Sequence, residues 1–168
     1  MGLTSFLLPE RRPRQVIYAG DRHVEIFALQ GNKIASRGRM EGATLAESDD
    51  GRWDEIAGHL RQEDTGIVFN AAPFIYNFFE FDKLPWQKKA LLELVAWRLQ
   101  KVFPENIEAY DHRFFPLDQK RVFSILVKRS LPERMEQLFS EKRIPLIYIG
   151  NSIMEILIRL QRAKLPPD

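Results

Sequence analysis

Two short apolar runs, residues 67–72 and 144–150, constrain the fold of this chain more than any other feature. A strand that is apolar along its whole length is covered on both faces, which is typical of parallel strands in α/β sheets. Three further strands are expected earlier in the chain, at residues 15–20, 22–30 and 33–41, and Gly31-Asn32 predicts a tight hairpin between the last two.

Helical patterns accompany these strands. Trp53, Ile56, Ala57 and Leu60 form a one-sided stripe before the first apolar run, and Asn151 or Ser152 begins a helix after the second. Ser152 and Glu155 form the S-x-x-E pattern of a capping box. This order predicts an α/β fold: the ribonuclease H-like (actin-like) half with a mixed sheet in which strands 1–3 are antiparallel.

A second unit is predicted between these two parts of the sheet. Its centre is an amphipathic helix at residues 84–104, on which one face carries Leu91, Leu94, Val95, Arg98 or Leu99, and Val102. Strands are expected around it at 74–82, 107–116 and 120–128, and a helix at 131–142 completes a β-α-β-β-α insertion. The predicted organisation is an N-terminal arm at 1–14, a core of 15–72 and 144–163, an inserted subdomain at 73–143 and a tail at 164–168.

Composition excludes several classes of protein. The formal net charge is only +2, from 25 basic and 23 acidic residues, so the chain lacks the charge excess of a dedicated nucleic-acid binder. The chain contains no cysteine, which excludes disulfides, thiolate catalysis and zinc sites with cysteine ligands. The three histidines are scattered along the sequence, which argues against a histidine metal site. No apolar stretch is long enough to cross a bilayer, and the N-terminus lacks the basic region that precedes the apolar residues of a signal peptide. We therefore expect a cytoplasmic protein without a metal site.

Catalytic motifs are also missing from the sequence. It has no G-x-S-x-G elbow, no P-loop, no G-x-G-x-x-G and no H-E-x-x-H. Ribonuclease H chemistry needs several carboxylates that converge on two metal ions, and one of these carboxylates comes from the first strand. The expected first strand, residues 15–20, contains no Asp or Glu. No catalytic residue is therefore assigned.

Specific residues point to a known family. Leu84-Pro85, Trp97, Pro104 and Tyr110-Asp111 follow one another in the order seen in PilM. The chain thus resembles the PilM family of type IV pilus proteins, and the cytoplasmic region of the type II secretion protein GspL is similar. The spacing from Trp97 to Pro104 matches the family pattern. The spacing from Leu84 to Trp97 is about one residue short, and the Asp-Tyr pair of the family appears here in the reverse order, as Tyr110-Asp111. The resemblance implies an actin-like protein peripheral to the bacterial inner membrane.

Departures from the family pattern fall on the first phosphate loop. Tyr18 occupies the expected Asp position, only Gly20 is kept, and Glu25 replaces a residue that is often basic. The second lobe of actin-like ATPases is not expected within these 168 residues, which are either a half-size relative or a piece of a longer protein. The resemblance therefore implies a degenerate fold with no cofactor. The alternative is an ATPase lobe completed by another chain, with ATP and magnesium at Gly20 and Asp21.

Aromatic residues suggest where a partner binds. Residues 74–81 carry five aromatic side chains, which lie on both faces of one expected strand. A single layer of helices covers only one face of a strand, so the other face is left for a partner. In the resembled family the cytoplasmic tail of a bitopic membrane protein docks in a groove between the inserted unit and the main sheet. The resemblance thus implies a non-catalytic scaffold that binds a PilN-like partner, with the assembly ATPase and a second copy as further partners. By position, the partner-binding residues are expected to be Phe69, Asn70, Phe74 and Phe78.

Overall fold

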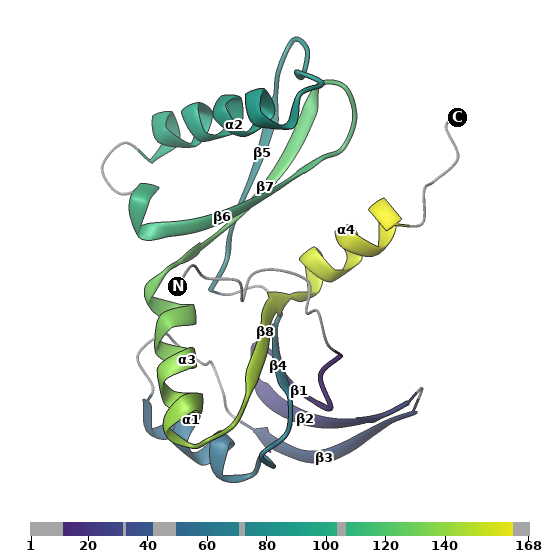
Figure 1. Cartoon of the computed structure of the whole chain (residues 1–168), viewed down its shortest axis with the longest axis vertical. Helices are drawn as coiled ribbons and strands as arrows, with labels where there is room; N and C mark the ends of the chain where they lie inside the picture. Colours follow the sequence, from purple (N-terminus) through teal and green to yellow (C-terminus); the bar gives the residue numbers. More distant parts are fainter. Residues whose placement is uncertain (1–11, 32, 42–49, 71–72, 104–106, 163–168) are drawn as a thin grey trace. The chain divides into compact units, whose positions relative to one another are not determined.

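The computed structural model describes residues 12–31, 33–41, 50–70, 73–103 and 107–162. Its chain divides into two compact units (Figure 1). Unit 1 contains residues 1–73 and 131–168, and unit 2 contains residues 74–130. Parts of the expected arm at 1–14 and the expected tail at 164–168 lie outside the described residues.

Unit 1 is built on a five-stranded mixed sheet in the order β3-β2-β1-β4-β8. Strands β1, β2 and β3 are antiparallel neighbours, and β1, β4 and β8 run parallel. Gly31 adopts φ +60° at the β2–β3 turn, as a tight hairpin requires. The mixed sheet predicted from the sequence is therefore confirmed. The strands are β1 (Gln15–Ala19), β2 (His23–Gln30), β3 (Lys33–Glu41), β4 (Thr65–Phe69) and β8 (Leu146–Asn151).

Two helices, α1 (Asp50–Gly58) and α3 (Ser130–Glu141), lie on the same side of this sheet (Figure 1). The Trp53 ring of α1 packs edge-on against Phe69 of β4 and against Phe139 of α3, with centroids 6.0 and 6.5 Å apart. All three rings are fully buried. Lys142 also pairs with Asp54 at 3.0 Å, just beyond the end of α3. These contacts join both helices to the sheet.

A buried polar network holds the start of β1 against the loop before β4. The Gln15 amide donates to the Arg61 carbonyl at 2.7 Å and to Thr65 Oγ1 at 2.8 Å, and its oxygen accepts the Arg61 N–H at 3.2 Å. Thr65 Oγ1 donates in turn to the Glu63 carbonyl. Gln15 and Thr65 are both 0% exposed. Because every bond is inside the protein, the network fixes the backbone of residues 61–65.

Helix α4 (Ser152–Arg162) begins directly after β8. Its cap differs from the predicted Ser152–Glu155 box: the Asn151 side chain accepts the Met154 N–H at 2.7 Å, and Glu155 accepts a hydrogen bond from the Tyr148 hydroxyl. Asn151 caps the helix because it lies three residues before Met154. A Cβ on Gly150 would clash with the Tyr148 hydroxyl, so any larger residue at this position requires the tyrosine ring to shift.

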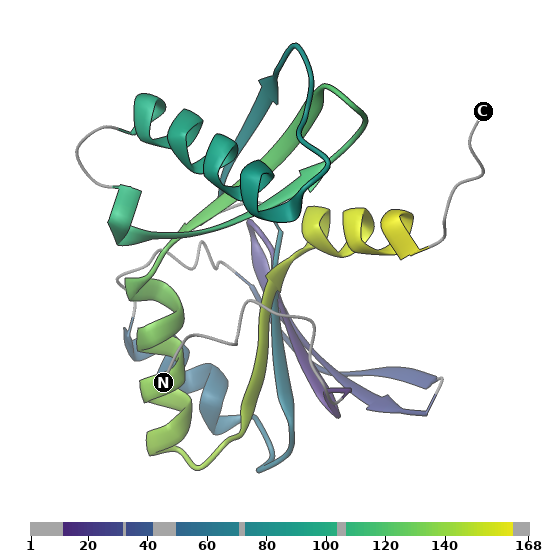
Figure 2. The same ribbon diagram turned by 45° about the horizontal axis from the view of Figure 1, so that its top comes forward.

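Unit 2 contains a three-stranded antiparallel sheet in the order β5-β7-β6. One helix, α2 (Lys88–Val102), lies along it, and a short turn, η1 (Ile107–Ala109), precedes β6 (Figure 2). The strands are β5 (Ile75–Glu80), β6 (Tyr110–Pro116) and β7 (Arg121–Lys128).

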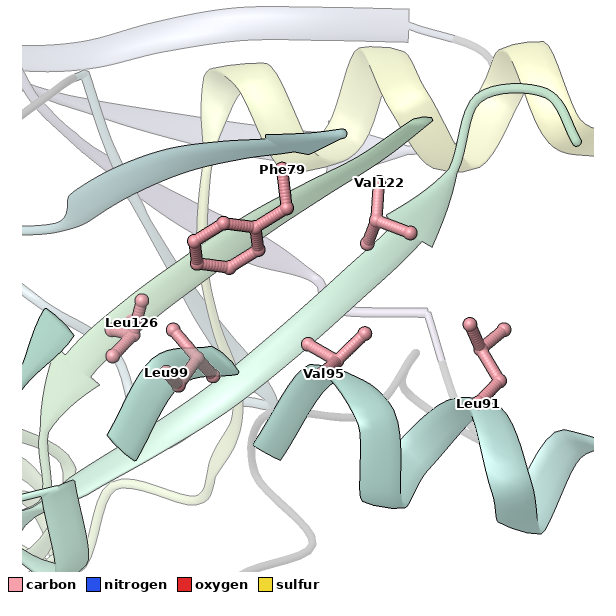
Figure 3. Packing of buried hydrophobic residues seen from close by; sticks show 6 residues of the cluster. All are labelled: Phe79, Leu91, Val95, Leu99, Val122 and Leu126. Atoms are coloured by element: carbon pink, nitrogen blue, oxygen red, sulfur yellow. The ribbon is translucent and has the colours of Figure 1, made fainter. Parts of the chain in front are cut away.

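The core of unit 2 lies between α2 and one face of this sheet. Leu91, Val95 and Leu99 project from the helix toward Phe79, Val122 and Leu126 (Figure 3). Leu91, Val95 and Leu99 of the predicted stripe are buried, so of the two residues expected at its fourth position Leu99, and not Arg98, faces the core. Val102 instead is 49% exposed, because the helix ends there and Phe103 packs against the core in its place.

Helix α3 falls in unit 1, apart from its first residue, whereas the sequence placed residues 131–142 in the insertion. The physical reason is packing: Phe139 contacts Trp53 of α1, and Lys142 pairs with Asp54 of the same helix. Unit 2 accordingly contains β5-α2-η1-β6-β7.

Candidate functional site

The turn between β1 and β2 carries the residues expected at a phosphate loop. The Gly20 N–H donates to the His23 carbonyl at 2.9 Å, and a Cβ on Gly20 would lie 3.1 Å from that carbonyl oxygen. Asp21 is exposed, and its carboxylate accepts a hydrogen bond from the Asn70 amide at 3.1 Å. The Asn70 N–H donates to the Ala19 carbonyl at 2.9 Å. The structure therefore brings Gly20, Asp21 and Asn70 together at the carboxyl ends of β1 and β4.

The carboxyl end of β8 meets the same edge of the sheet. Ser152 Oγ donates to the Asn70 carbonyl at 3.0 Å, which joins the start of α4 to the end of β4. Asn151 is fully buried, and its Nδ2 has no hydrogen-bond partner. The Asn70 side-chain amide is thus bonded to Asp21, and the Ser152 hydroxyl is bonded to the backbone carbonyl of Asn70.

This edge offers little for phosphate chemistry. Its carboxylate, Asp21, is held by a neutral amide, and Tyr18 and Glu25 occupy paired positions on β1 and β2 close by. A carboxylate repels a phosphate unless a metal ion lies between them. Across the described ranges, no three His, Asp or Glu side chains converge as a metal site. Nor do the described residues contain a helix of the length and apolarity that a bilayer span requires.

A second candidate surface lies in unit 2, on the face of the sheet opposite α2. Phe78 of β5 is 54% exposed there and pairs in register with Phe123 of β7, whereas its neighbour Phe79 faces α2. Tyr76 stacks on Phe123 with centroids 5.9 Å apart, and burial raises the pKa of the Tyr76 phenol above 10.0. We call Tyr76, Phe78 and Phe123 the aromatic face of unit 2. It is an apolar surface that is partly open to solvent.

The four residues expected to bind a partner lie in different environments. Phe78 is exposed, and Asn70 is half-buried at the carboxyl edge of unit 1. Phe69 is 2% exposed beneath Trp53, and Phe74 is 7% exposed. Phe69 therefore belongs to the core of unit 1, and of the three phenylalanines Phe78 alone presents its ring to solvent. The sequence shows the aromatic strand but not which of its rings is covered.

The exposure of other apolar side chains of unit 2 is not predicted from the sequence, where Trp97 serves as a position of the family pattern. Trp86 is 91% exposed before α2, and Trp97 is 50% exposed on the helix with Lys101 Nζ 3.8 Å from its ring centroid. Leu92 and Leu117 are also exposed. The helical stripe is the sequence signal that could have predicted their exposure, because Leu92 and Trp97 fall outside the apolar face of the helix.

No family model and no curated protein sequence matches this chain. Solved structures with a similar fold are known. The cytoplasmic domain of EpsL, an inner membrane component of the type II secretion system of Vibrio cholerae, has a TM-score of 0.62 and 11% identity over 85% of this chain. The PilM–PilN type IV pilus biogenesis complex has a TM-score of 0.64 and 16% identity over 91% of this chain.

A Bacteroides thetaiotaomicron protein with an actin-like ATPase fold and unknown function has a TM-score of 0.50 and 8% identity over 89% of this chain. The matches cover 58%, 51% and 56% of the three solved chains, so this chain spans little more than half of their length. At such low identities the likeness shows the fold, which is actin-like, and it agrees with the resemblance to PilM and GspL found in the sequence.

Proposed function

We propose that this chain is a non-catalytic scaffold of a type IV pilus or type II secretion platform at the bacterial inner membrane. In this role it lies on the cytoplasmic side and binds the cytoplasmic tail of a bitopic, PilN-like membrane protein. The observation that carries the proposal is the aromatic face of unit 2, where Phe78 is 54% exposed in an actin-like fold whose neighbours include a PilM–PilN complex. Exposed aromatic side chains are common anchors in protein interfaces.

The lack of catalysis is supported by the carboxyl edge of unit 1. Asp21 is bonded to Asn70, and Ser152 bonds to the Asn70 carbonyl, so these groups already have partners within the protein. Tyr18 stands where the resembled ATPases carry a carboxylate for magnesium. An ATPase needs backbone N–H groups, a cation and a metal-binding carboxylate around the phosphates. The residues at this edge are a poor match to that requirement.

Calorimetric titration with a synthetic peptide of the partner tail tests the proposal. We expect Phe78→Ser to weaken binding by about tenfold or more, because a partly exposed aromatic ring at an interface is worth over 1 kcal/mol. Trp86→Ser is the matched control, since this ring is 91% exposed in unit 2 but lies outside the aromatic face. Phe74 is a poor probe, because at 7% exposure its replacement disturbs packing.

Two results would contradict this assignment. One is tail binding that is equally strong in Phe78→Ser and in the unmodified chain, with both proteins folded by circular dichroism. The other is a thermal shift with Mg-ATP, since a ligand at 100 times its dissociation constant adds about 2.7 kcal/mol to stability. Loss of that shift in Asp21→Asn would favour the alternative, an ATP-binding lobe completed by another chain.

A further inference from the structure

A cleft of about 860 Å³ opens in unit 1, at the amino end of β1 and beside the β2–β3 hairpin. Its lining includes four arginines and one acidic residue, Glu63, with apolar positions between them. The arginines come from three separate segments: Arg12 and Arg14 before β1, Arg37 on β3 and Arg61 after α1. None of these residues belongs to the carboxyl edge or to the aromatic face described above.

Positive charge is concentrated in this cleft. The surplus of three positive charges in its lining exceeds the net charge of the whole chain, which is +2. The single carboxylate offsets little, because Glu63 reaches only Arg37, at 3.9 Å. Among the described residues, no acidic side chain pairs with Arg12, Arg14 or Arg61. Unpaired guanidinium groups around a concave surface favour an anionic ligand.

The backbone at two of these arginines is held in place. Gln15, which is 0% exposed, bonds to both the N–H and the carbonyl of Arg61. Arg14 donates its N–H to the Asp64 carbonyl at 2.7 Å and accepts the Leu29 N–H at 2.8 Å. The cleft is therefore organised before any ligand arrives, which lowers the entropy lost on binding.

Apolar side chains and an open strand edge accompany the charges. Leu29 and Ile34 line the cleft, and Ile34 is 71% exposed. Ile34 lies on β3, which pairs with β2 alone and forms one edge of the five-stranded sheet. An edge strand offers unpaired backbone N–H and C=O groups to an extended chain. A lipid headgroup or a free phosphate makes no use of such an edge.

We propose that this cleft binds an acidic, extended segment of another protein, with its carboxylates on Arg12, Arg14 and Arg61 and an apolar side chain on Ile34. The peptide crosses the cleft from the arginines at the amino end of β1 to Ile34, and only its far end reaches the open edge of β3. This site is separate from the aromatic face, so the proposal does not rest on the partner suggested above. It adds a second docking surface, selective for negative charge, to the same chain.

Fluorescence anisotropy of the full chain tests the proposal with a labelled peptide of glutamates around a central leucine. The expected result is binding that weakens as salt is added, because exposed charges are screened. Arg14→Glu/Arg61→Glu is expected to lower affinity by about 30-fold or more, since two charge-assisted hydrogen bonds are lost. The control, Arg22→Glu/Arg98→Glu, makes the same change in net charge outside the cleft and is expected to alter affinity by about threefold at most.

Arg14→Gln/Arg61→Gln guards against misfolding, because it removes charge without adding a repulsive one and leaves the backbone bonds of both residues available. We expect it to weaken binding by an intermediate factor while urea unfolding stays close to that of the unmodified chain. Three outcomes would overturn the proposal. These are equal loss in the cleft and control variants, no binding of the acidic peptide, or binding of phosphatidylglycerol vesicles without binding of the peptide.

Discussion

The two units differ in how far they satisfy buried polar groups and cover apolar ones. In unit 1 the buried Gln15 and Thr65 side chains have hydrogen-bond partners, although Asn151 Nδ2 has none, and of its described large apolar residues Ile34 and Ile156 are exposed. In unit 2 the buried Ser124 hydroxyl and the Asn77 amide nitrogen lack partners. Unit 2 also exposes six large apolar side chains: Phe78, Trp86, Leu92, Trp97, Val102 and Leu117.

This difference indicates a division of roles. A sheet with mostly satisfied buried polar groups and covered apolar faces is suited to keep its own structure. A small sheet covered by one helix, with aromatic side chains left in solvent, is suited to bind something else. Unit 1 also concentrates charge in the arginine cleft, so the two proposed surfaces differ in chemistry as well as in position.

The largest effect is predicted for a substitution that removes the buried hydrogen-bond network of unit 1. Gln15→Leu leaves the N–H and carbonyl of Arg61 without their buried partner, so we expect a loss of about 2–3 kcal/mol in the free energy of unfolding. Urea denaturation measures it. The same variant should weaken the binding of the acidic peptide to the cleft, because the backbone of Arg61 is no longer held in place. A change in stability below about 0.5 kcal/mol would show that water replaces the network at little cost.

A smaller effect of opposite sign is expected in unit 2. Ser124 is 0% exposed, faces α2 and lies opposite Asn77 in the sheet register. Ser124→Ala removes a buried hydroxyl that has no partner, so stability should rise by about 0.5–1 kcal/mol in the same assay. Destabilisation would mean that Ser124 and Asn77 bond to each other in solution, and the contrast between the units would then weaken.

The smallest effect concerns pH. Burial lowers the pKa of His112 below 6.5, and Asp111 and Arg129 act on it with opposite signs. Between the native pKa and 6.5 the unfolded chain binds more protons than the folded one, so stability rises with pH in this window and falls on acidification. His112→Gln should lose less stability than the unmodified chain when urea unfolding is compared at about pH 7 and pH 5. Equal losses would assign the dependence to other groups.

Much of the fold was predictable from local patterns. The runs at 67–72 and 144–150 correspond to β4 and β8, and the Gly31 turn and the α2 stripe also appear in the structure. Periodicity reports which face of an element is apolar, because the repeat of a helix or strand is a local property. It failed at Val102 and at the cap of α4, where the end of a helix depends on its neighbours.

The candidate surfaces were less predictable. Five aromatic side chains on one strand marked residues 74–81, but nothing in the sequence distinguishes the exposed Phe78 from the covered Phe79 or Phe74. Arg12 and Arg14 fall in the N-terminal arm expected at residues 1–14, whereas Arg37 and Arg61 lie far along the chain. Their meeting depends on the β2–β3 hairpin and on the Gln15 network.

The amino-acid sequence by itself determined the order and type of the elements and the absence of cysteine chemistry. Only the tertiary structure decided that α3 packs with α1, that Phe69 is core and that four arginines share one cleft. The physical reason is that element type follows from neighbours within a few residues, whereas burial and charge clustering arise between segments far apart in the chain.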